Sequence, residues 1–285
     1  MAPPRDSLRG PPPDSGPTER AVPPSPGAAP LPHTRLVPAT ALQHHPISVV
    51  VLPAGDLDVA RQFYSAAFGW RMRRVSETVA VSFMTTGPSI VLRCYGAGDD
   101  APTTPLLQVP DVDQALADVV ARGGKQVAEP YDVPLGGRIV RFADPSGTVY
   151  GLTSNIPAGA VPQVAIPVGA NPRPDVGTIC SLEMHASNLA ATADFFAGAF
   201  GWHSIPTLPH STAFDPGAGI TGIWQSHSPS TPALPYIYVA NVERALGDVA
   251  RAGGTPRGAP TVVPGMATFG YFTDPSGTPM GVMGG

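Results

Sequence analysis

A glutamate and a histidine lie two residues apart in the run ICSLEMH, in the second half of the chain. Side chains alternate between the two faces of a β-strand, so a strand here places Glu183 and His185 on the same face. A carboxylate and an imidazole in that arrangement can act as a general base with its orienting partner, or anchor a polar ligand at two points. The alternative is that one is exposed near the strand end and the other satisfies a local backbone group. Because carboxylates are seldom buried without a purpose, we take Glu183 and His185 as the candidate catalytic residues.

Aromatic and amide side chains form a second set of candidates. Tyr236 and Tyr238 share one face of the predicted strand ALPYIYV, and Trp224 lies in the predicted strand GITGIWQ. Gln108 occupies the corresponding face of the predicted strand LLQV in the first half. Aromatic walls with a few polar groups suit a flat organic ligand, whereas ordinary core packing is the alternative for each aromatic alone. We predict that these four residues bind ligand.

Composition excludes several classes of function. The 285 residues include 17 basic and 21 acidic side chains, for a net charge of −4, and the basic residues form no long run. Binding to nucleic acid or to an anionic membrane needs such a basic surface, so we predict neither partner. The two cysteines, Cys94 and Cys180, lie in different halves of the chain and have no metal-ligand spacing. We expect buried free thiols in a reducing compartment, and therefore a cytoplasmic protein.

An internal repeat organises most of the chain. Phe68-Gly69-Trp70 recurs 132 residues later as Phe200-Gly201-Trp202, and the run DVDQALADVVARGG recurs 130 residues later as NVERALGDVARAGG. The run FADPSG recurs at the same spacing as FTDPSG. Three ordered matches at a nearly constant offset indicate a duplicated domain. We assign the first domain to residues 46–155 and the second to residues 176–285.

Each domain repeats internally as well. The run PISVVVL predicts a strand, and Asp56 then caps a helix whose buried stripe includes Leu57, Ala60 and Phe63. Short strands follow near 71–75, 79–84 and 89–95, and the order then restarts with LLQV and a helix capped by Asp111. The predicted order is β-α-β-β-β, twice per domain, with helices on one face of each sheet.

Proline-rich stretches bound the domains. Residues 1–44 contain few large apolar side chains and cannot bury enough surface to offset their ordering entropy, so we predict a disordered tail. The proline-rich composition of residues 156–175 predicts a semi-rigid linker.

The run DLDVARQFYSAAFGW and its copy NLAATADFFAGAFGW, with the DVD-type helix and the DPSG turn, resemble the vicinal oxygen chelate superfamily. That superfamily includes glyoxalase I, bleomycin-resistance proteins and extradiol dioxygenases. The resemblance implies an α+β fold, in which paired βαβββ modules curl an eight-stranded sheet into a cup with the helices outside. It implies small-molecule chemistry within each cup, and in many members a divalent metal ion.

The positions that correspond to the superfamily's metal ligands carry other residues here. Val49 and Ser181 stand at the first position, Thr104 and Leu234 at the next, and Gly151 and Gly281 on the last strand. Such sites need several nitrogen or oxygen donors at fixed geometry, so we predict no metal ion and no other cofactor.

The resemblance and the missing ligands favour a metal-independent protein that binds a small organic molecule in secondary metabolism, as a monomer or homodimer. The rival hypotheses are a lyase or isomerase with Glu183 as base, a metal-dependent lyase or dioxygenase whose ligands have moved, and a scaffold that docks through its tail. Val51 and Pro53 occupy the first-domain positions that match Glu183 and His185, so we expect an inert first cup and an active second one. In the first domain, Arg138 and Arg141 either clamp an anion or are simply solvated.

Overall fold

The computed structural model describes residues 44–96, 102–132, 137–154, 174–227 and 233–284. Every described residue belongs to one compact unit. The predicted tail, apart from its last residue His44, and most of the predicted linker lie outside the described residues. No helix in the described part of the chain has the length and apolar character needed to cross a bilayer.

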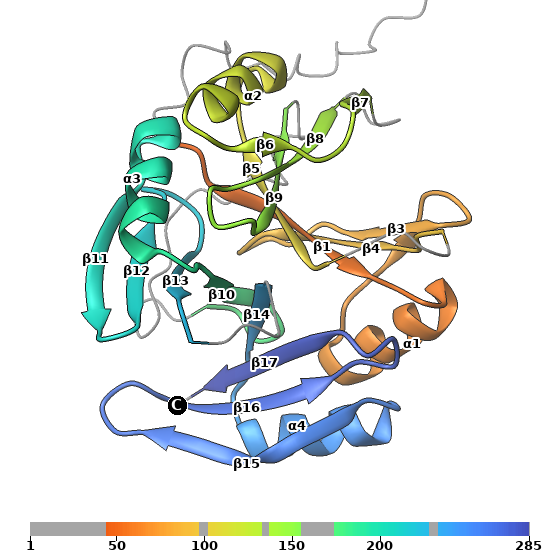
Figure 1. The fold of residues 1–285 in the computed structure, drawn as a ribbon. Coiled ribbons are helices and arrows are strands. Elements are labelled where there is room, and N and C mark those ends of the chain that lie inside the picture. Colours follow the sequence, from red (N-terminus) through yellow and green to blue (C-terminus); the bar gives the residue numbers. More distant parts are fainter. Residues whose placement is uncertain (1–43, 97–101, 133–136, 155–173, 228–232, 285) are drawn as a thin grey trace, which may run out of the picture. The chain divides into compact units, whose positions relative to one another are not determined.

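The first domain is one curled sheet with two helices (Figure 1). Its strands run in the order β2-β3-β4-β1-β5-β9-β8-β6, and a short β7 pairs with β8. The central pair, β1 and β5, is antiparallel, and each lies parallel to the last strand of its own module, β4 and β9. The elements are β1 (Ile47–Pro53), α1 (Leu57–Phe68), β2 (Arg73–Arg74), β3 (Val79–Ser82), β4 (Ser89–Arg93), β5 (Thr104–Gln108), α2 (Val112–Ala121), β6 (Lys125–Gln126), β7 (Tyr131–Asp132), β8 (Arg138–Ala143) and β9 (Val149–Thr153).

The second domain repeats this arrangement with an eight-stranded sheet, in the order β11-β12-β13-β10-β14-β17-β16-β15. The predicted α+β fold with two cupped sheets is therefore confirmed, except that the first sheet has the additional strand β7. The elements are β10 (Ile179–His185), α3 (Leu189–Phe200), β11 (His203–Leu208), β12 (Ser211–Asp215), β13 (Thr221–Gln225), β14 (Ala233–Tyr238), α4 (Val242–Arg251), β15 (Thr255–Val263), β16 (Ala267–Thr273) and β17 (Pro279–Gly284).

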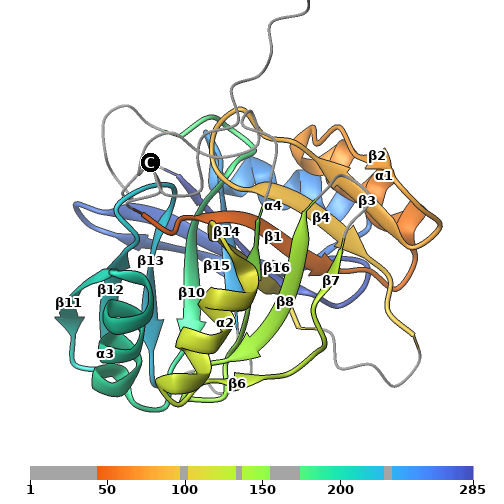
Figure 2. The same ribbon diagram turned by 90° about the horizontal axis from the view of Figure 1, so that it is seen from above.

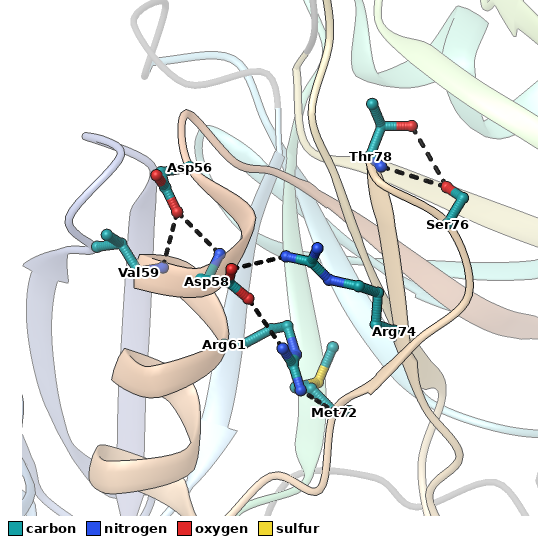
Figure 3. A network of polar contacts seen from close by, with 8 residues as sticks. All are labelled: Asp56, Asp58, Val59, Arg61, Met72, Arg74, Ser76 and Thr78. Atoms are coloured by element: carbon teal, nitrogen blue, oxygen red, sulfur yellow. Dashed lines mark hydrogen bonds and ion pairs between the residues drawn. The ribbon is translucent and has the colours of Figure 1, made fainter.

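Helix α1 begins and ends where the sequence predicts. The Asp56 side chain accepts hydrogen bonds from the backbone N–H groups of Asp58 and Val59, at 2.8 and 2.9 Å, and so satisfies donors that a helix start leaves unpaired. Gly69 ends the helix with a positive φ of 73°, a conformation that glycine adopts without steric cost. Asp58 pairs with Arg61 and also with Arg74 on β2, which ties the helix to the edge of the sheet (Figure 3).

The helices pair across the domains: α1 contacts α4, and α2 contacts α3 (Figures 1 and 2). One hydrophobic core runs through both domains on this side of the sheets. The two repeated tryptophans contribute polar links, since the Trp70 indole donates to the Gly177 carbonyl at 2.6 Å and the Trp202 indole to the His45 carbonyl at 3.0 Å. Buried indole N–H groups need such acceptors, which accounts for a structural role of both residues at this junction.

The opposite faces of the two sheets form the cups. On β1, Val50 and Leu52 pack into the shared core, whereas Val49 and Val51 belong to a separate cluster with Leu106 on the other face. The second domain has a corresponding cluster that contains Leu234, Tyr236 and Met283. The alternation that the sequence predicts along these strands therefore separates helix-facing from cup-facing side chains.

Candidate functional site

The cup of the first domain encloses a cavity of about 320 Å³. Its floor is apolar, because Val49, Val51 and Leu106 are 7, 8 and 2% exposed and pack with the partly buried Val91 and Ile139. These residues come from three adjoining strands, β4, β1 and β5, and from β8, which β9 separates from β5. A concave apolar site of this size with few polar groups suits a small organic ligand.

One polar atom in this cavity has no partner. Ser89 lines the cavity and is 3% exposed, and its Oγ atom makes no hydrogen bond. It pairs in register with Val49, so both side chains point to the cup face. A buried hydroxyl without a partner is costly, and a polar ligand atom can remove that cost.

Two arginines and two tyrosines lie together at the border of the same cavity. The Arg93 guanidinium donates to the Tyr131 hydroxyl at 2.6 Å and lies 4.9 Å from the centre of the Tyr95 ring. From β8, the Arg141 guanidinium lies 5.9 Å from the same Tyr95 ring. Side chains from opposite parts of the sheet, β4 and β7–β8, therefore meet at this cluster, which we call the Arg–Tyr cluster.

In the second domain, a carboxylate occupies the cup face. The Tyr236 hydroxyl donates to Glu183 at 2.8 Å, and the Tyr236 and Tyr271 hydroxyl oxygens lie 3.3 Å apart. Burial raises the pKa of Glu183, and the hydrogen bond from Tyr236 and the nearby His227 lower it by less. A partly buried carboxyl group with a raised pKa binds a proton more readily than an exposed one, so Glu183 has the character of a general base.

His185 is the last residue of β10, the strand that also carries Glu183. Its Nδ1 atom is buried and has no hydrogen-bond partner, whereas its backbone carbonyl accepts from Thr148 of the first domain at 2.6 Å. Glu183 and His185 thus share the predicted face of β10, but no hydrogen bond between their side chains is present. Tyr238 packs against the cluster that contains Tyr236, in agreement with their predicted common face.

Two predicted ligand-binding residues lie elsewhere. Trp224 is fully buried in the shared core, and its indole donates to the Tyr150 hydroxyl at 3.0 Å. Its strand neighbours Ile223 and Gln225, by alternation, are the residues of β13 that face the cup. Gln108 is buried near the start of β1, where Ser48 donates to its Oε1 atom at 3.5 Å, and it does not line the first cavity.

Arg138 and Arg141 separate in the structure. Arg138 forms ion pairs with Asp113 and Asp132, both at 3.1 Å, whereas Arg141 lines the first cavity. The prediction of an inert first cup considers only Val51 and Pro53 and leaves out the polar residues of β4. Alternation along SIVLRCY places Ser89, Val91 and Arg93 on the same face as Val49, so this signal was available in the sequence.

The positions that hold a metal ion in related folds do not fit one here. Val49 and Ser181 stand on the first strands, and Gly151 and Gly281 on the last strands provide no donor. A Cβ atom on Gly151 would lie 2.3 Å from Leu106, and one on Gly281 would lie 2.4 Å from the Tyr236 ring, so neighbouring side chains fill the space of a ligand there. Among the described residues, no group of three or more His, Cys, Asp or Glu side chains is placed to hold a metal. Metal coordination requires such a convergent donor set.

Paired βαβββ modules with a cup on one face and helices on the other define the class of fold. Residues 46–150 match the Glyoxalase/Bleomycin resistance protein/Dioxygenase superfamily. The match covers the first domain, and the second domain repeats the same strand order.

Three known proteins illustrate the likeness. A Mycobacterium bovis protein named "Putative glyoxylase CFP32" is 24% identical over 250 residues, which cover 82% of this chain and 92% of that protein. The anthracycline biosynthesis protein DnrV of Streptomyces peucetius is 25% identical over 169 residues, 53% of this chain and 58% of that protein. The crystal structure of the Mn(II)-bound glyoxalase from Novosphingobium aromaticivorans superposes with a TM-score of 0.62 at 20% identity, over 85% of this chain and 82% of that one. At this identity the structural likeness establishes the fold alone.

Proposed function

We propose that this protein binds a small organic molecule, without a metal ion, in the cup of the first domain. The observation that carries the proposal is the cavity of about 320 Å³ with an apolar floor and the unpaired Ser89 hydroxyl. Sites of this kind hold organic ligands by burying apolar surface, while a few polar groups set orientation.

The proposed context is the handling of a secondary metabolite. The likeness to an anthracycline biosynthesis protein supports it, as does the apolar cavity, which suits a polyketide-like or aromatic compound. In the part of the chain that the structure describes, no side chains are grouped to hold a metal, which supports a role in sequestering or presenting such a compound.

A cavity-filling pair of variants tests the site. Val91 pairs with Val51 on the first cup face, and Ile223 pairs with Glu183 at the matching place in the second domain. A thermal-shift screen against a metabolite library should find ligands that stabilise the wild type and Ile223→Phe but not Val91→Phe. Ligands that stabilise Val91→Phe fully, and fail with Ile223→Phe, would move the site to the second cup.

Metal independence is tested separately. Purified protein dialysed against a chelator should keep its ligand affinity, and elemental analysis should find less than stoichiometric Fe, Mn, Zn or Ni. Stoichiometric metal that the chelator removes together with ligand binding would overturn this part of the proposal.

The hydrogen bond between Tyr236 and Glu183 favours a second candidate, a lyase or isomerase that uses Glu183 as base. The raised pKa of Glu183 suits proton transfer, and the unpaired Nδ1 atom of His185 offers a second polar contact to a substrate. Turnover of any compound found in the screen should then be lost in Glu183→Gln and kept in Val91→Phe. Turnover that survives Glu183→Gln would remove this candidate.

A further inference from the structure

We infer that the second cup binds an organic ammonium ion, whose nitrogen is held by Glu183 beside the rings of Tyr236 and Tyr271. The inference goes beyond the proposed function, which concerns the cavity of the first cup, and the two can fail independently. It is carried by a partly buried carboxyl group that has no cationic partner and that lies among hydrogen-bond acceptors and aromatic rings.

Glu183 forms no ion pair in the part of the chain that the structure describes. The arginine ion pairs there go to aspartates of α1, α2, α4 and β7. Arg257, which pairs with Tyr271 in register, is exposed and donates to the Thr273 hydroxyl at 3.4 Å. Burial raises the pKa of Glu183, and the exposed His227 lowers it by less. A partly buried carboxylate without a counter-charge is costly, and a cationic ligand removes part of that cost.

The polar atoms around this carboxyl group present more acceptors than donors. The Tyr236 hydroxyl donates to Oε2 of Glu183 at 2.8 Å, and the Tyr271 hydroxyl oxygen lies 3.3 Å from that of Tyr236. No described residue donates a hydrogen bond to Oε1 of Glu183. On the same face of β10, Nδ1 of His185 is buried and has no partner. A carboxylate only accepts, and a hydroxyl oxygen keeps lone pairs when it donates. A primary ammonium group, which has three N–H donors and a positive charge, complements such a site.

Aromatic rings flank the same carboxyl group on β14 and β16. The Tyr236 ring packs edge to face against those of Phe269 and Tyr271, with ring centres 5.8 and 6.1 Å apart. Tyr271 is 37% exposed, so its ring is accessible to a ligand. The faces of aromatic rings attract cations, and the attraction increases when the cation is desolvated. The rings therefore favour a charged nitrogen over a neutral hydroxyl group and also offer apolar contact to the rest of the ligand.

The first cup does not repeat this arrangement. Register places Val51 and Leu106 there at the positions of Glu183 and Tyr236. The preference for an ammonium ion should therefore belong to the second domain alone.

Matched probes test the charge. 2-Naphthylmethylamine, protonated at pH 7, and 2-naphthalenemethanol have similar shapes and differ in charge, and both are fluorescent. Their affinities are measured in a Val91→Phe background, because this substitution fills the first cup. The amine should bind about tenfold more tightly than the alcohol, as expected for a charge-assisted hydrogen bond. Adding Glu183→Gln, which keeps the shape of the side chain, should bring the two affinities to within about twofold of each other. Adding Glu243→Gln, which neutralises an exposed carboxylate of α4, should leave the preference unchanged.

Two substitutions of one tyrosine test the rings. Tyr271→Leu should reduce the preference for the amine by about threefold, whereas Tyr271→Phe keeps the ring and should keep most of the preference. Equal losses in the two variants would overturn the role of the ring. Near-ultraviolet circular dichroism of each variant checks that the fold is retained.

Three results would overturn the inference: equal affinities for the two probes, no measurable binding of the amine, or a preference that persists with Glu183→Gln. None of them touches the proposed function, because neutral ligands that bind the wild type and Ile223→Phe would still report the first cup. Conversely, a preference for the amine that depends on Glu183 in the Val91→Phe background supports the second cup even if no ligand of the first is found.

Discussion

The two cups have the same backbone and different chemistry. Register places Val51, Leu106 and Arg141 in the first domain where Glu183, Tyr236 and Tyr271 stand in the second. The first set forms an apolar floor with a cation at its border, whereas the second forms a hydrogen-bonded carboxylate–tyrosine group.

The difference teaches that the fold and the site are separable. Residues on the helix side are apolar in both domains, because they build one shared core. Residues on the cup side make no contribution to that core, so they can diverge between the copies without loss of the fold. A duplicated chain can therefore hold two different sites on the same scaffold.

The largest effect is expected at the floor of the first cup. Leu106→Ala removes a side chain that is 2% exposed and covers Gly151, and should lower the free energy of unfolding by about 3 kcal/mol. Urea unfolding measures it, with Leu208→Ala as control, since Leu208 is 71% exposed and should change stability by less than about 0.5 kcal/mol. A loss below about 1 kcal/mol at Leu106 would show that the floor is not packed.

The glycines on the last strands should respond differently to the same substitution. A Cβ atom on Gly281 meets Tyr236 ring carbons at 2.4 and 2.5 Å, whereas one on Gly151 meets the end of the Leu106 side chain at 2.3 Å. The leucine can change rotamer, but the tyrosine ring is held by its hydroxyl group. Gly281→Ala should therefore cost about 2 kcal/mol and Gly151→Ala less than about 1, by chemical denaturation. Equal costs would show that the Tyr236 ring is not held in place by its hydroxyl group.

Tyr236→Phe tests the polar group of the second cup through pH. The substitution removes the hydroxyl donor of Glu183 and should raise the pKa of this carboxyl group further above its ordinary value of 4.5. An acid with a raised folded-state pKa loses stability as pH rises above its unfolded value. The variant should thus be less stable than wild type by about 1–2 kcal/mol at pH 7, and this deficit should shrink below pH 4.5.

Tyr238→Phe is the matched control, because Tyr238 packs beside the same cluster and its hydroxyl has no assigned role with Glu183. If the loss of stability in Tyr236→Phe is the same at pH 7 and pH 4, the loss does not arise from the ionisation of Glu183.

The smallest effect is expected at Ser89. Its hydroxyl is buried and unpaired, so Ser89→Ala should leave the ligand-free protein unchanged or more stable by up to about 1 kcal/mol. Thermal unfolding without ligand measures this. A clear destabilisation would mean that the hydroxyl has a partner within the protein, and would weaken its assignment to a ligand.

Much of the scaffold could be predicted from sequence because its signals are local. Asp56 and Asp111 cap the helices as expected, and the repeated Phe-Gly-Trp motif ends α1 and α3 with glycines at positive φ. Strand alternation placed Glu183 and Tyr236 on the cup face, where a hydrogen bond joins them. Trp224 was predicted to bind ligand but lies in the shared core, because an aromatic residue suits a core as well as a ligand wall and composition does not distinguish them.

The sequence by itself determined the duplication, the strand and helix order, and the absence of usual metal-ligand residue types at the expected positions. Each of these depends on residue identity and spacing along the chain. Only the tertiary structure showed that the first cup holds a cavity and which side chains meet there. Arg93, Tyr131 and Arg141 come from separate strands, and the curl of the sheet brings them together. Such convergence depends on long-range packing, which no local pattern encodes.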